Sequence, residues 1–277
     1  MKVTTKQKKI LKIIAFLVAT TLTLGVVFFA HAFLGNPVSK YICTKSAEKY
    51  LAQTYGETDF VLEEVNYNFK TGGYYAHISS PSSADSHFSL DFSLFGALQR
   101  DYYHYVSDGW NTLMRCEDGY RELVQSVLSA PDFPYISELD FGSFISSDDK
   151  FRNLQGSFVL DQEFDYEGLG KEYGELVYYA QVEEITLEKM CEVLLGIKGI
   201  FDEKEVYFCR ISLCLEKPYI DGYKNFEGET LRIENFLSED IYEEGLLERV
   251  TKAKEEYDVY VEEEEKMADV EGEMLDS

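Results

Sequence analysis

The chain has 277 residues, of which 26 are basic and 51 acidic, and its net charge is −25. The first 34 residues hold five lysines and no acid, so residues 35–277 carry a net charge of −30. This charge repels phosphate backbones and excludes nucleic acid as a partner. With 21 tyrosines and 19 phenylalanines, the acidic part can bury a core, which excludes a disordered acidic spacer.

A lysine-rich segment, residues 1–12, precedes an apolar run at residues 13–34. As a helix, these 22 residues would be about 33 Å long, enough to cross a hydrocarbon core of about 30 Å. Basic flanks stay on the cytoplasmic side of a membrane. We therefore expect a single-pass anchor in the cell membrane, with a cytoplasmic N-terminus and extracellular C-terminal domains.

A cleavable signal peptide is the alternative interpretation of this start. Ala30-His31-Ala32 has the small-x-small form of a cleavage site. The apolar core before that site, residues 13–29, has 17 residues, whereas cleaved signals have cores of about 7–15. We therefore favour the uncleaved anchor over secretion, and both interpretations place the rest of the chain outside the membrane.

The five cysteines form neither a zinc-binding spacing nor a disulfide framework. We interpret them as small buried thiols. Low reliance on disulfides is typical of an exported protein of a Gram-positive bacterium. The five residues are Cys43, Cys116, Cys191, Cys209 and Cys214.

Residues 36–130 are expected to form a first α+β domain. Asn36-Pro37 is a helix start, and an apolar stripe continues to Gly56. Alternating side chains then predict strands at residues 60–70, 74–79 and 87–95, and helical spacing covers residues 98–128. This order predicts an antiparallel sheet packed against a helix.

Residues 131–260 are expected to form a second α+β domain of the same kind. The segment 130–134, with Pro131 and Pro134, is the predicted linker. Strands are predicted at residues 174–184, 205–216 and 230–236, and helices after the caps Thr186 and Ser238. Residues 261–277 read as an acidic disordered tail because their like charges repel.

Several short motifs along residues 1–120 resemble the YfjL-like family of uncharacterised membrane-anchored proteins of Gram-positive bacteria. The motifs are Asn36-Pro37-Val38-Ser39-Lys40, Ala47, Tyr50, Leu51, Tyr67-Asn68-Phe69-Lys70, Tyr74-Tyr75, Ser79-Ser80-Pro81, Asp85, His87-Phe88, Gly109, Asn111-Thr112 and Arg115. The resemblance implies a single-pass exported protein with a small α+β domain, and it implies no catalytic residues. The second half shows no resemblance that we can name.

The densest polar cluster is Asp85-Ser86-His87, which follows a serine-rich loop. A hydrolase would use His87 as base and Asp85 as its orienting partner, with Ser80, Ser82 or Ser83 as nucleophile. The chain lacks a GxSxG elbow, and an Asp and a His two residues apart on a strand do not meet as a triad pair. We favour a structural role, in which Asp85 caps the loop and His87 bonds across the hairpin.

A metal site at this position would need His77 and His87 on paired strands, with Asp85 or His104 as third ligand. Two histidines on strands are more often polar surface positions. We therefore expect no catalytic residue, no metal site and no cofactor.

The helical region is expected to break near Gly109 or Gly119, and Trp110 and Asn111 follow Gly109. Tryptophan is enriched at interface hot spots, which makes these two residues candidates for partner contact, together with Asp85 and His87. The plainer interpretation is that Trp110 fills the core. Tyrosine clusters at residues 102–105 and 178–179 could stack on sugars, but they fit amphipathic faces better.

These observations favour a membrane-anchored binding or envelope-assembly module without catalysis, whose partner is an envelope protein. One alternative is a cell-envelope hydrolase that uses the Asp85/His87 region. Another is a secreted soluble binding protein, released by signal cleavage.

Overall fold

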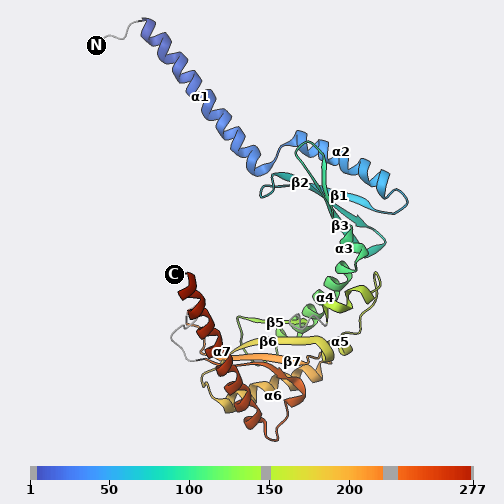
Figure 1. Cartoon of the computed structure of the whole chain (residues 1–277), viewed down its shortest axis with the longest axis vertical. Coiled ribbons are helices and arrows are strands. Elements are labelled where there is room, and N and C mark those ends of the chain that lie inside the picture. Colours follow the sequence, from blue (N-terminus) through green and yellow to red (C-terminus); the bar gives the residue numbers. More distant parts are fainter. Residues whose placement is uncertain (1–4, 145–150, 221–229, 276–277) are drawn as a thin grey trace. The chain divides into compact units, whose positions relative to one another are not determined.

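The computed structural model describes residues 5–144, 151–220 and 230–275 (Figure 1). The contacts divide the chain into two compact units. Unit 1 comprises Met1–Thr112 and Val159–Asp161, and unit 2 comprises Leu113–Phe158 and Gln162–Ser277. Each unit contains one four-stranded sheet with helices, so the predicted α+β class is confirmed.

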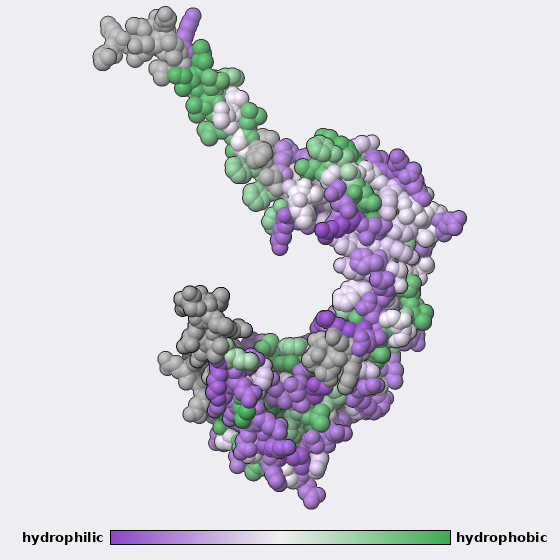
Figure 2. All heavy atoms as spheres, viewed as in Figure 1, coloured by the Kyte–Doolittle hydropathy of each residue, from purple (hydrophilic) through white to green (hydrophobic). Residues whose placement is uncertain are grey.

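The apolar run forms a single long helix, α1 (Thr5–Leu34). Its segment Lys12–His31 is long and apolar enough to cross a membrane, and none of that segment is buried inside the protein. Figure 2 shows hydrophobic residues along this helix. Side chains such as that of Phe16 are exposed along this segment, whereas Phe33, near the end of α1, lies with its ring centroid 6.5 Å from that of Phe69.

Unit 1 continues with one helix followed by a meander of strands. Asn36 caps α2 (Pro37–Thr54) by accepting a hydrogen bond from the Ser39 amide. The antiparallel sheet has the order β1-β2-β3-β4, and two helices follow it. Their bounds are β1 (Val61–Asn68), β2 (Gly73–Ser80), β3 (Ser83–Phe92), β4 (Leu98–Asp101), α3 (His104–Ser107) and α4 (Trp110–Leu128).

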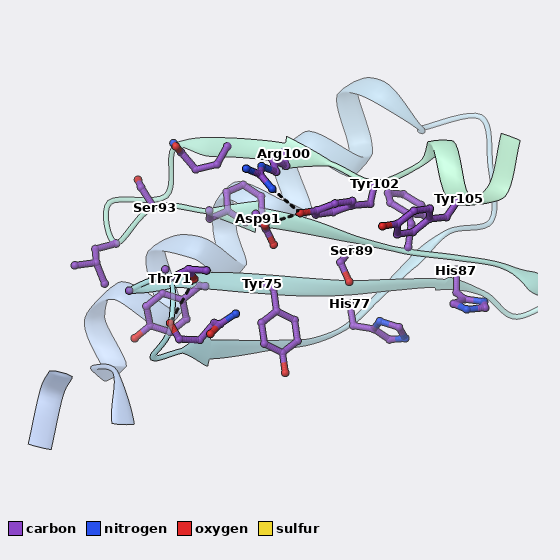
Figure 3. A pocket seen from close by; sticks show the side chains of 18 of the residues that line it. Thr71, Tyr75, His77, His87, Ser89, Asp91, Ser93, Arg100, Tyr102 and Tyr105 are labelled. Atoms are coloured by element: carbon purple, nitrogen blue, oxygen red, sulfur yellow. Dashed lines mark hydrogen bonds between the residues drawn. The ribbon is translucent and has the colours of Figure 1, made fainter. Parts of the chain in front are cut away.

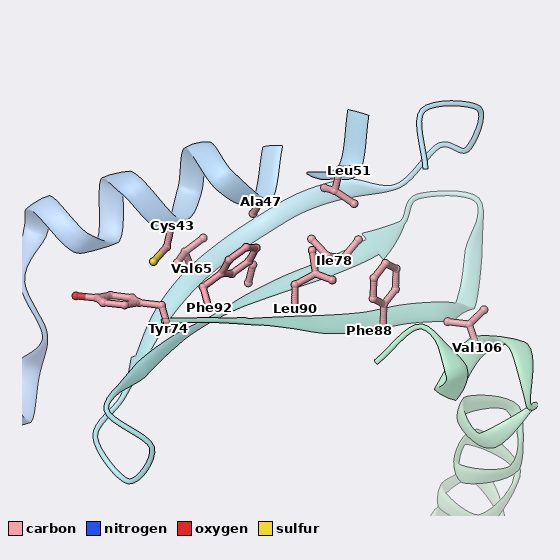
Figure 4. Packing of buried hydrophobic residues seen from close by; sticks show 11 residues of the cluster. Cys43, Ala47, Leu51, Val65, Tyr74, Ile78, Phe88, Leu90, Phe92 and Val106 are labelled. Atoms are coloured by element: carbon pink, nitrogen blue, oxygen red, sulfur yellow. The ribbon is translucent and has the colours of Figure 1, made fainter. Parts of the chain in front are cut away.

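The core of unit 1 lies between α2 and the sheet. Alternate residues of β2 and β3 are buried, as the period of two along a strand requires. Figure 4 shows these side chains pointing toward α2. The buried cluster comprises Cys43, Ala47, Leu51, Val65, Tyr74, Ala76, Ile78, Phe88, Leu90, Phe92 and Val106.

Residues 98–101 form the edge strand β4, so the helical region predicted over residues 98–128 begins too early. The rest of that prediction is confirmed by α3 and α4. Gly96 adopts a φ of +77°, and the Gly96 amide donates to the Ser93 carbonyl at 2.9 Å. This tight turn returns the chain alongside β3, where Arg100 pairs with Asp91. Most of β4 is exposed, so it lacks the buried alternation that identifies an inner strand.

Unit 2 contains a sheet of order β5-β6-β7-β8. The pair β6–β7 is parallel and the other two pairs are antiparallel, so the expectation of a purely antiparallel sheet is wrong here. Helix α6 provides the crossover that a parallel pair needs. The elements are β5 (Asp140–Phe144), η1 (Arg152–Ser157), α5 (Tyr166–Tyr173), β6 (Gly174–Gln181), α6 (Leu187–Glu203), β7 (Arg210–Glu216), β8 (Leu231–Leu237), η2 (Ser238–Asp240) and α7 (Leu246–Leu275).

The boundary between the units differs from the predicted linker at residues 130–134. The contacts divide between Thr112 and Leu113, inside α4, and residues 159–161 belong to unit 1. Asp161 and Asp85 are joined by two hydrogen bonds. These bonds hold residues 159–161 against unit 1. A fragment of residues 36–130 therefore lacks part of unit 1.

Residues 261–275 form the end of α7 rather than a disordered tail, and residues 276–277 lie outside the described residues. Opposite charges four residues apart occur along this helix, as in Lys254–Asp258 at 2.5 Å and Glu262–Lys266 at 3.5 Å. Such pairs stabilise a helix by about 0.2–0.5 kcal/mol each. They offset part of the repulsion on which the prediction of disorder rested.

All five cysteines are free in the structure. Cys43, Cys116 and Cys214 are buried, whereas Cys191 and Cys209 are partly exposed. Burial raises the pKa of the Cys116 thiol to about 12. A thiol with such a pKa stays protonated and unreactive at neutral pH.

Candidate functional site

The sheet of unit 1 has an open face opposite α2. Because side chains alternate along a strand, this face carries the residues between the buried ones. Tyr75 pairs with Asp91 across β2 and β3, and His77 pairs with Ser89. Figure 3 shows these side chains projecting from the sheet.

The open face forms the floor of a groove of about 920 Å³, here called the open-face groove. One end is formed by the turn between β1 and β2 together with the loop between β3 and β4, because Tyr74 pairs with Phe92. His77 and His87 lie toward the other end, and the segment that follows β4 forms a side. The lining residues are Asn68, Thr71, Gly72, Gly73, Tyr74, Tyr75, His77, His87, Phe88, Ser89, Asp91, Phe92, Ser93, Leu94, Phe95, Gln99, Arg100, Tyr102, Tyr105, Trp110 and Asn111. The volume falls within the range of about 300–1,000 Å³ that is typical of ligand sites.

A charged pair is linked through a tyrosine in this groove. The Tyr102 hydroxyl donates to Asp91 Oδ2 at 3.3 Å and accepts from Arg100 Nη1 at 3.3 Å (Figure 3). The hydrogen bond to Tyr102 and the nearby Asp91 charge raise the pKa of Arg100. The Tyr102 ring also stacks on Tyr105, with centroids 5.6 Å apart, so its position is held from two sides.

The two histidines lie near each other on the open face. The centroids of the His77 and His87 rings are 6.3 Å apart, and Glu63 Oε2 lies 3.9 Å from His77 Nε2. Ser79 donates a hydrogen bond to Glu63. Within the part of the chain that the structure describes, no group of three His, Cys, Asp or Glu side chains could hold a metal ion.

Asp85 is fully buried and faces a distant part of the chain rather than His87. Its Oδ2 accepts a hydrogen bond from the Asp161 amide at 2.7 Å, and its own amide donates to Asp161 Oδ1 at 3.1 Å. Asp161 adopts a φ of +60°, a conformation that Asp tolerates better than most residues. These two hydrogen bonds fix the first residues of β3, where Asp85 lies.

His87 and the serines have partners that do not form a catalytic relay. His87 Nδ1 lies 3.1 Å from the Ala84 carbonyl, within the first residues of β3 rather than across the hairpin. Ser80 and Ser82 donate to Asp59, and Ser83 donates to Ser86. The nucleophile–base–acid order that a hydrolase needs is therefore not assembled among these residues.

Asn111 links the first turn of α4 to the first residues of β3. Its Nδ2 donates to the Asp85 carbonyl at 2.8 Å and to the His87 carbonyl at 2.6 Å, and the side chain is buried. The structure thus brings Asp85, His87 and Asn111 together through the backbone. Trp110, the residue before Asn111, is half-buried beside the groove instead of filling the core as expected.

Asp59 should titrate below its ordinary pKa. Hydrogen bonds from Ser82 (2.5 Å) and Ser80 (2.7 Å) stabilise its carboxylate and lower its pKa from 3.8. The resulting stabilisation is present above pH 3.8 and is lost as the pH falls through the lowered pKa of the folded state. We expect Ser82→Ala to raise the pKa of Asp59 in an NMR titration, whereas Ser83→Ala should leave it unchanged. Equal values in both variants would contradict this hydrogen-bond network.

Family models match both parts of the chain. A model described as the YfjL-like N-terminal domain matches residues 8–102, and one described as the YfjL-like C-terminal domain matches residues 119–251. The resemblance therefore extends beyond residues 1–120, and the expectation that the second half has none is wrong.

Two solved structures are similar in part. A DUF5037 family protein from Ruminococcus gnavus is 15% identical, with 76% of this chain and 98% of that chain covered and a TM-score of 0.25. A DUF1672 family protein from Staphylococcus aureus is 10% identical, with 73% and 92% covered and a TM-score of 0.25. Likenesses at these scores carry no argument about function. A search of the curated proteins finds no match.

Proposed function

We propose that this chain, which belongs to the YfjL-like family, is a membrane-anchored protein that binds a protein partner through the open-face groove and catalyses no reaction. The proposal retains the anchored topology expected from the lysine-rich start and the apolar helix α1. The observation that carries it is the chemical composition of the groove.

The groove resembles an antibody combining site in its residue types. Antibody loops are enriched in Tyr, Ser, Gly and Asn, with Trp and Arg at hot spots. The groove combines Tyr75, Tyr102 and Tyr105 with serines, glycines and asparagines, one tryptophan and one arginine. The side chain of Tyr74 belongs to the core instead. Tyrosine supplies a large contact area at low cost in side-chain entropy, and the hydroxyls and amides adapt their hydrogen bonds to the partner.

Much of the groove is organised before any partner arrives. Its floor consists of paired strands, and Tyr102 is held by Asp91, Arg100 and Tyr105. Binding to an ordered surface loses less side-chain freedom than binding to a mobile one. The net charge of −30 on residues 35–277 also favours a partner with a neutral or basic contact surface.

The hydrolase alternative has less support, because Asp85 pairs with Asp161 and His87 contacts the Ala84 carbonyl of its own strand. The secreted alternative differs only in whether the chain is cleaved after Ala32, and it leaves the groove unchanged. Broad aromatic surfaces favour binding over catalysis, since catalysis requires convergent groups at hydrogen-bond distance.

A crosslinking experiment tests the proposed binding. The full-length chain is crosslinked in membranes of its host, and captured proteins are compared among the wild type, Tyr102→Ala and the control Tyr260→Ala. Tyr260 is exposed on α7, outside the open-face groove. We expect Tyr102→Ala to weaken capture more than about tenfold, as truncation of a hot-spot tyrosine does, while Tyr260→Ala retains it.

Two results would overturn the proposal. One is equal capture by both variants, which would place the contact outside the groove. The other is specific capture of a glycan, which would assign the tyrosines to sugar stacking. Circular dichroism of both variants shows whether lost capture reflects lost folding.

A further inference from the structure

An exposed apolar surface lies beside the end of the anchor helix. On α2, Val38, Tyr41 and Ile42 face away from the core, and Val38 is 69% exposed. In the loop between β3 and β4, Leu94 and Phe95 are also exposed, Phe95 to 86%. We call these five residues the juxtamembrane patch. Contiguous exposed apolar groups of this kind mark interaction surfaces.

The two parts of the patch form one surface because the loop packs on α2. A Cβ placed on Gly96 would lie 2.8 Å from Ile42 Cγ2 and 2.6 Å from Ser46 Oγ. The Cys43 thiol also donates to the Ser93 carbonyl at 3.3 Å. Figure 2 shows hydrophobic residues gathered over α2.

The patch is tied closely to the end of α1. Helix α1 ends at Leu34 and α2 begins at Pro37. The Tyr74 hydroxyl accepts from the Asn36 amide at 2.7 Å and donates to the Asn36 carbonyl at 2.8 Å, so the connection is fixed to the sheet. Val38 comes four positions after Leu34, so their Cα atoms are at most about 14 Å apart.

Basic residues follow the patch along the same face of α2. Lys45 and Lys49 continue the spacing of Tyr41 and Ile42, in a chain whose exterior is otherwise strongly acidic. Glu48 pairs with Lys45 at 2.6 Å and offsets part of this charge. Lysines near a bilayer surface are attracted to anionic headgroups.

We propose that the juxtamembrane patch lies in the headgroup region of the same bilayer that α1 spans. Apolar and aromatic groups on an interfacial helix are buried about 5–10 Å into the boundary between headgroups and acyl chains. Tyr41 and Phe95 suit this region, where aromatic rings gather. The proposal rests on the proposed anchoring. Leu94 and Phe95 also line the open-face groove, so the bilayer would lie at that end of the groove. This placement holds unit 1 against the membrane surface.

The single tryptophan allows a direct depth measurement. In a Trp110→Phe background, Phe95→Trp places a fluorescent reporter in the patch, and Val61→Trp places a control at the opposite end of the sheet. Phe16→Trp reports the anchor itself. The full-length variants are reconstituted in vesicles of phosphatidylglycerol and phosphatidylcholine, with bromine on the acyl chains close to the headgroup. Bromine quenches tryptophan only at short range.

We expect brominated lipid to remove most of the emission from the reporters at positions 95 and 16, and little from the reporter at position 61. Quenching at position 16 without quenching at position 95 would overturn the juxtamembrane proposal and leave the anchor intact. Loss of quenching at both positions would overturn the anchoring as well. A blue-shifted, unquenched reporter at position 95 would instead indicate contact with a second copy. Tyr41→Trp, a conservative change at an exposed position, repeats the test if Phe95→Trp fails to fold.

Discussion

Replacement of Tyr120 by alanine is expected to lower the free energy of unfolding of unit 2 by about 3–5 kcal/mol, as truncation of a large buried aromatic side chain does. Tyr120 is fully buried, and its ring stacks on Phe144 with centroids 4.4 Å apart. Its hydroxyl donates to the Tyr207 carbonyl at 2.8 Å. It also lies so close to Gly174 that a Cβ there would be 2.2 Å from the hydroxyl oxygen. One side chain therefore joins α4, β5, β6 and the segment before β7.

Tyr120→Phe separates the contribution of the ring to stability from that of the hydroxyl. It keeps the stacking on Phe144 but leaves the buried Tyr207 carbonyl without this donor, at an expected cost of about 1–3 kcal/mol. Hydrogen exchange of the β5 and β6 amides measures the effect on unit 2 alone. Bulk unfolding of the whole chain would mix the stabilities of the two units. The control Tyr260→Ala should change stability by less than about 0.5 kcal/mol. A cost of that size for Tyr120→Ala would contradict its place in the core.

Asn111→Ala should destabilise unit 1 by leaving two backbone carbonyls without their donor. The Asn111 amide bonds both Asp85 and His87 carbonyls, and each buried group left unsatisfied costs about 1–3 kcal/mol. We expect faster hydrogen exchange in β3 and in the first turn of α4. Gln99→Ala is the matched control, because its amide makes an exposed bond of 3.3 Å to the Ala97 carbonyl.

Asp85→Ala extends this prediction to the residue that the hydrolase alternative would need. It removes the acceptor of the Asp161 amide, so we expect lower stability and loosened packing of residues 159–161 on unit 1. The same variant should leave partner capture by the groove within about twofold of wild type once it is folded, since surface and structural changes outside a hot spot affect binding little. A specific hydrolytic turnover that Asp85→Ala abolishes without unfolding would restore the enzyme interpretation.

The layer of helix over sheet in unit 1 could be predicted because its signals are local. Tyr74, Ala76 and Ile78 alternate with polar neighbours, and this pattern requires one buried face. Asn36, Pro37 and Thr186 mark helix starts by their chemistry, and the structure has helices at those points. At these positions the secondary structure is determined by residues close in the sequence.

Other elements have no such signal. The four residues of β4 are mostly exposed and take their conformation from pairing with β3. In β5, Gly142 interrupts the pattern because Val124 packs on it, and a Cβ at that position would lie 2.4 Å from Val124 Cγ2. The mixed sheet of unit 2 likewise depends on which strands α6 brings together, and the strand pattern alone does not specify that.

The candidate site was only partly predictable for the same reason. Residue type alone singles out Asp85, His87, Trp110 and Asn111. In the structure, the Asn111 amide bonds the Asp85 and His87 carbonyls at the start of β3. The pairing of Asp85 with Asp161, 76 residues away, has no local signal. Asp91 and Arg100 were missed. Asp91 could have been found on the polar face of the predicted strand, whereas Arg100 depended on the unrecognised β4.

The connection between β6 and β7 gives the two units different folding problems. The sheet of unit 1 is built from consecutive hairpins, so each strand pair closes only a short loop. The parallel pair of unit 2 cannot form until α6 has been synthesised and packed, so its loop-closure entropy is larger and its folding slower. During synthesis the chain would therefore hold an unfinished second sheet while unit 1 still awaits residues 159–161, so neither unit is complete until the middle of the chain has been made.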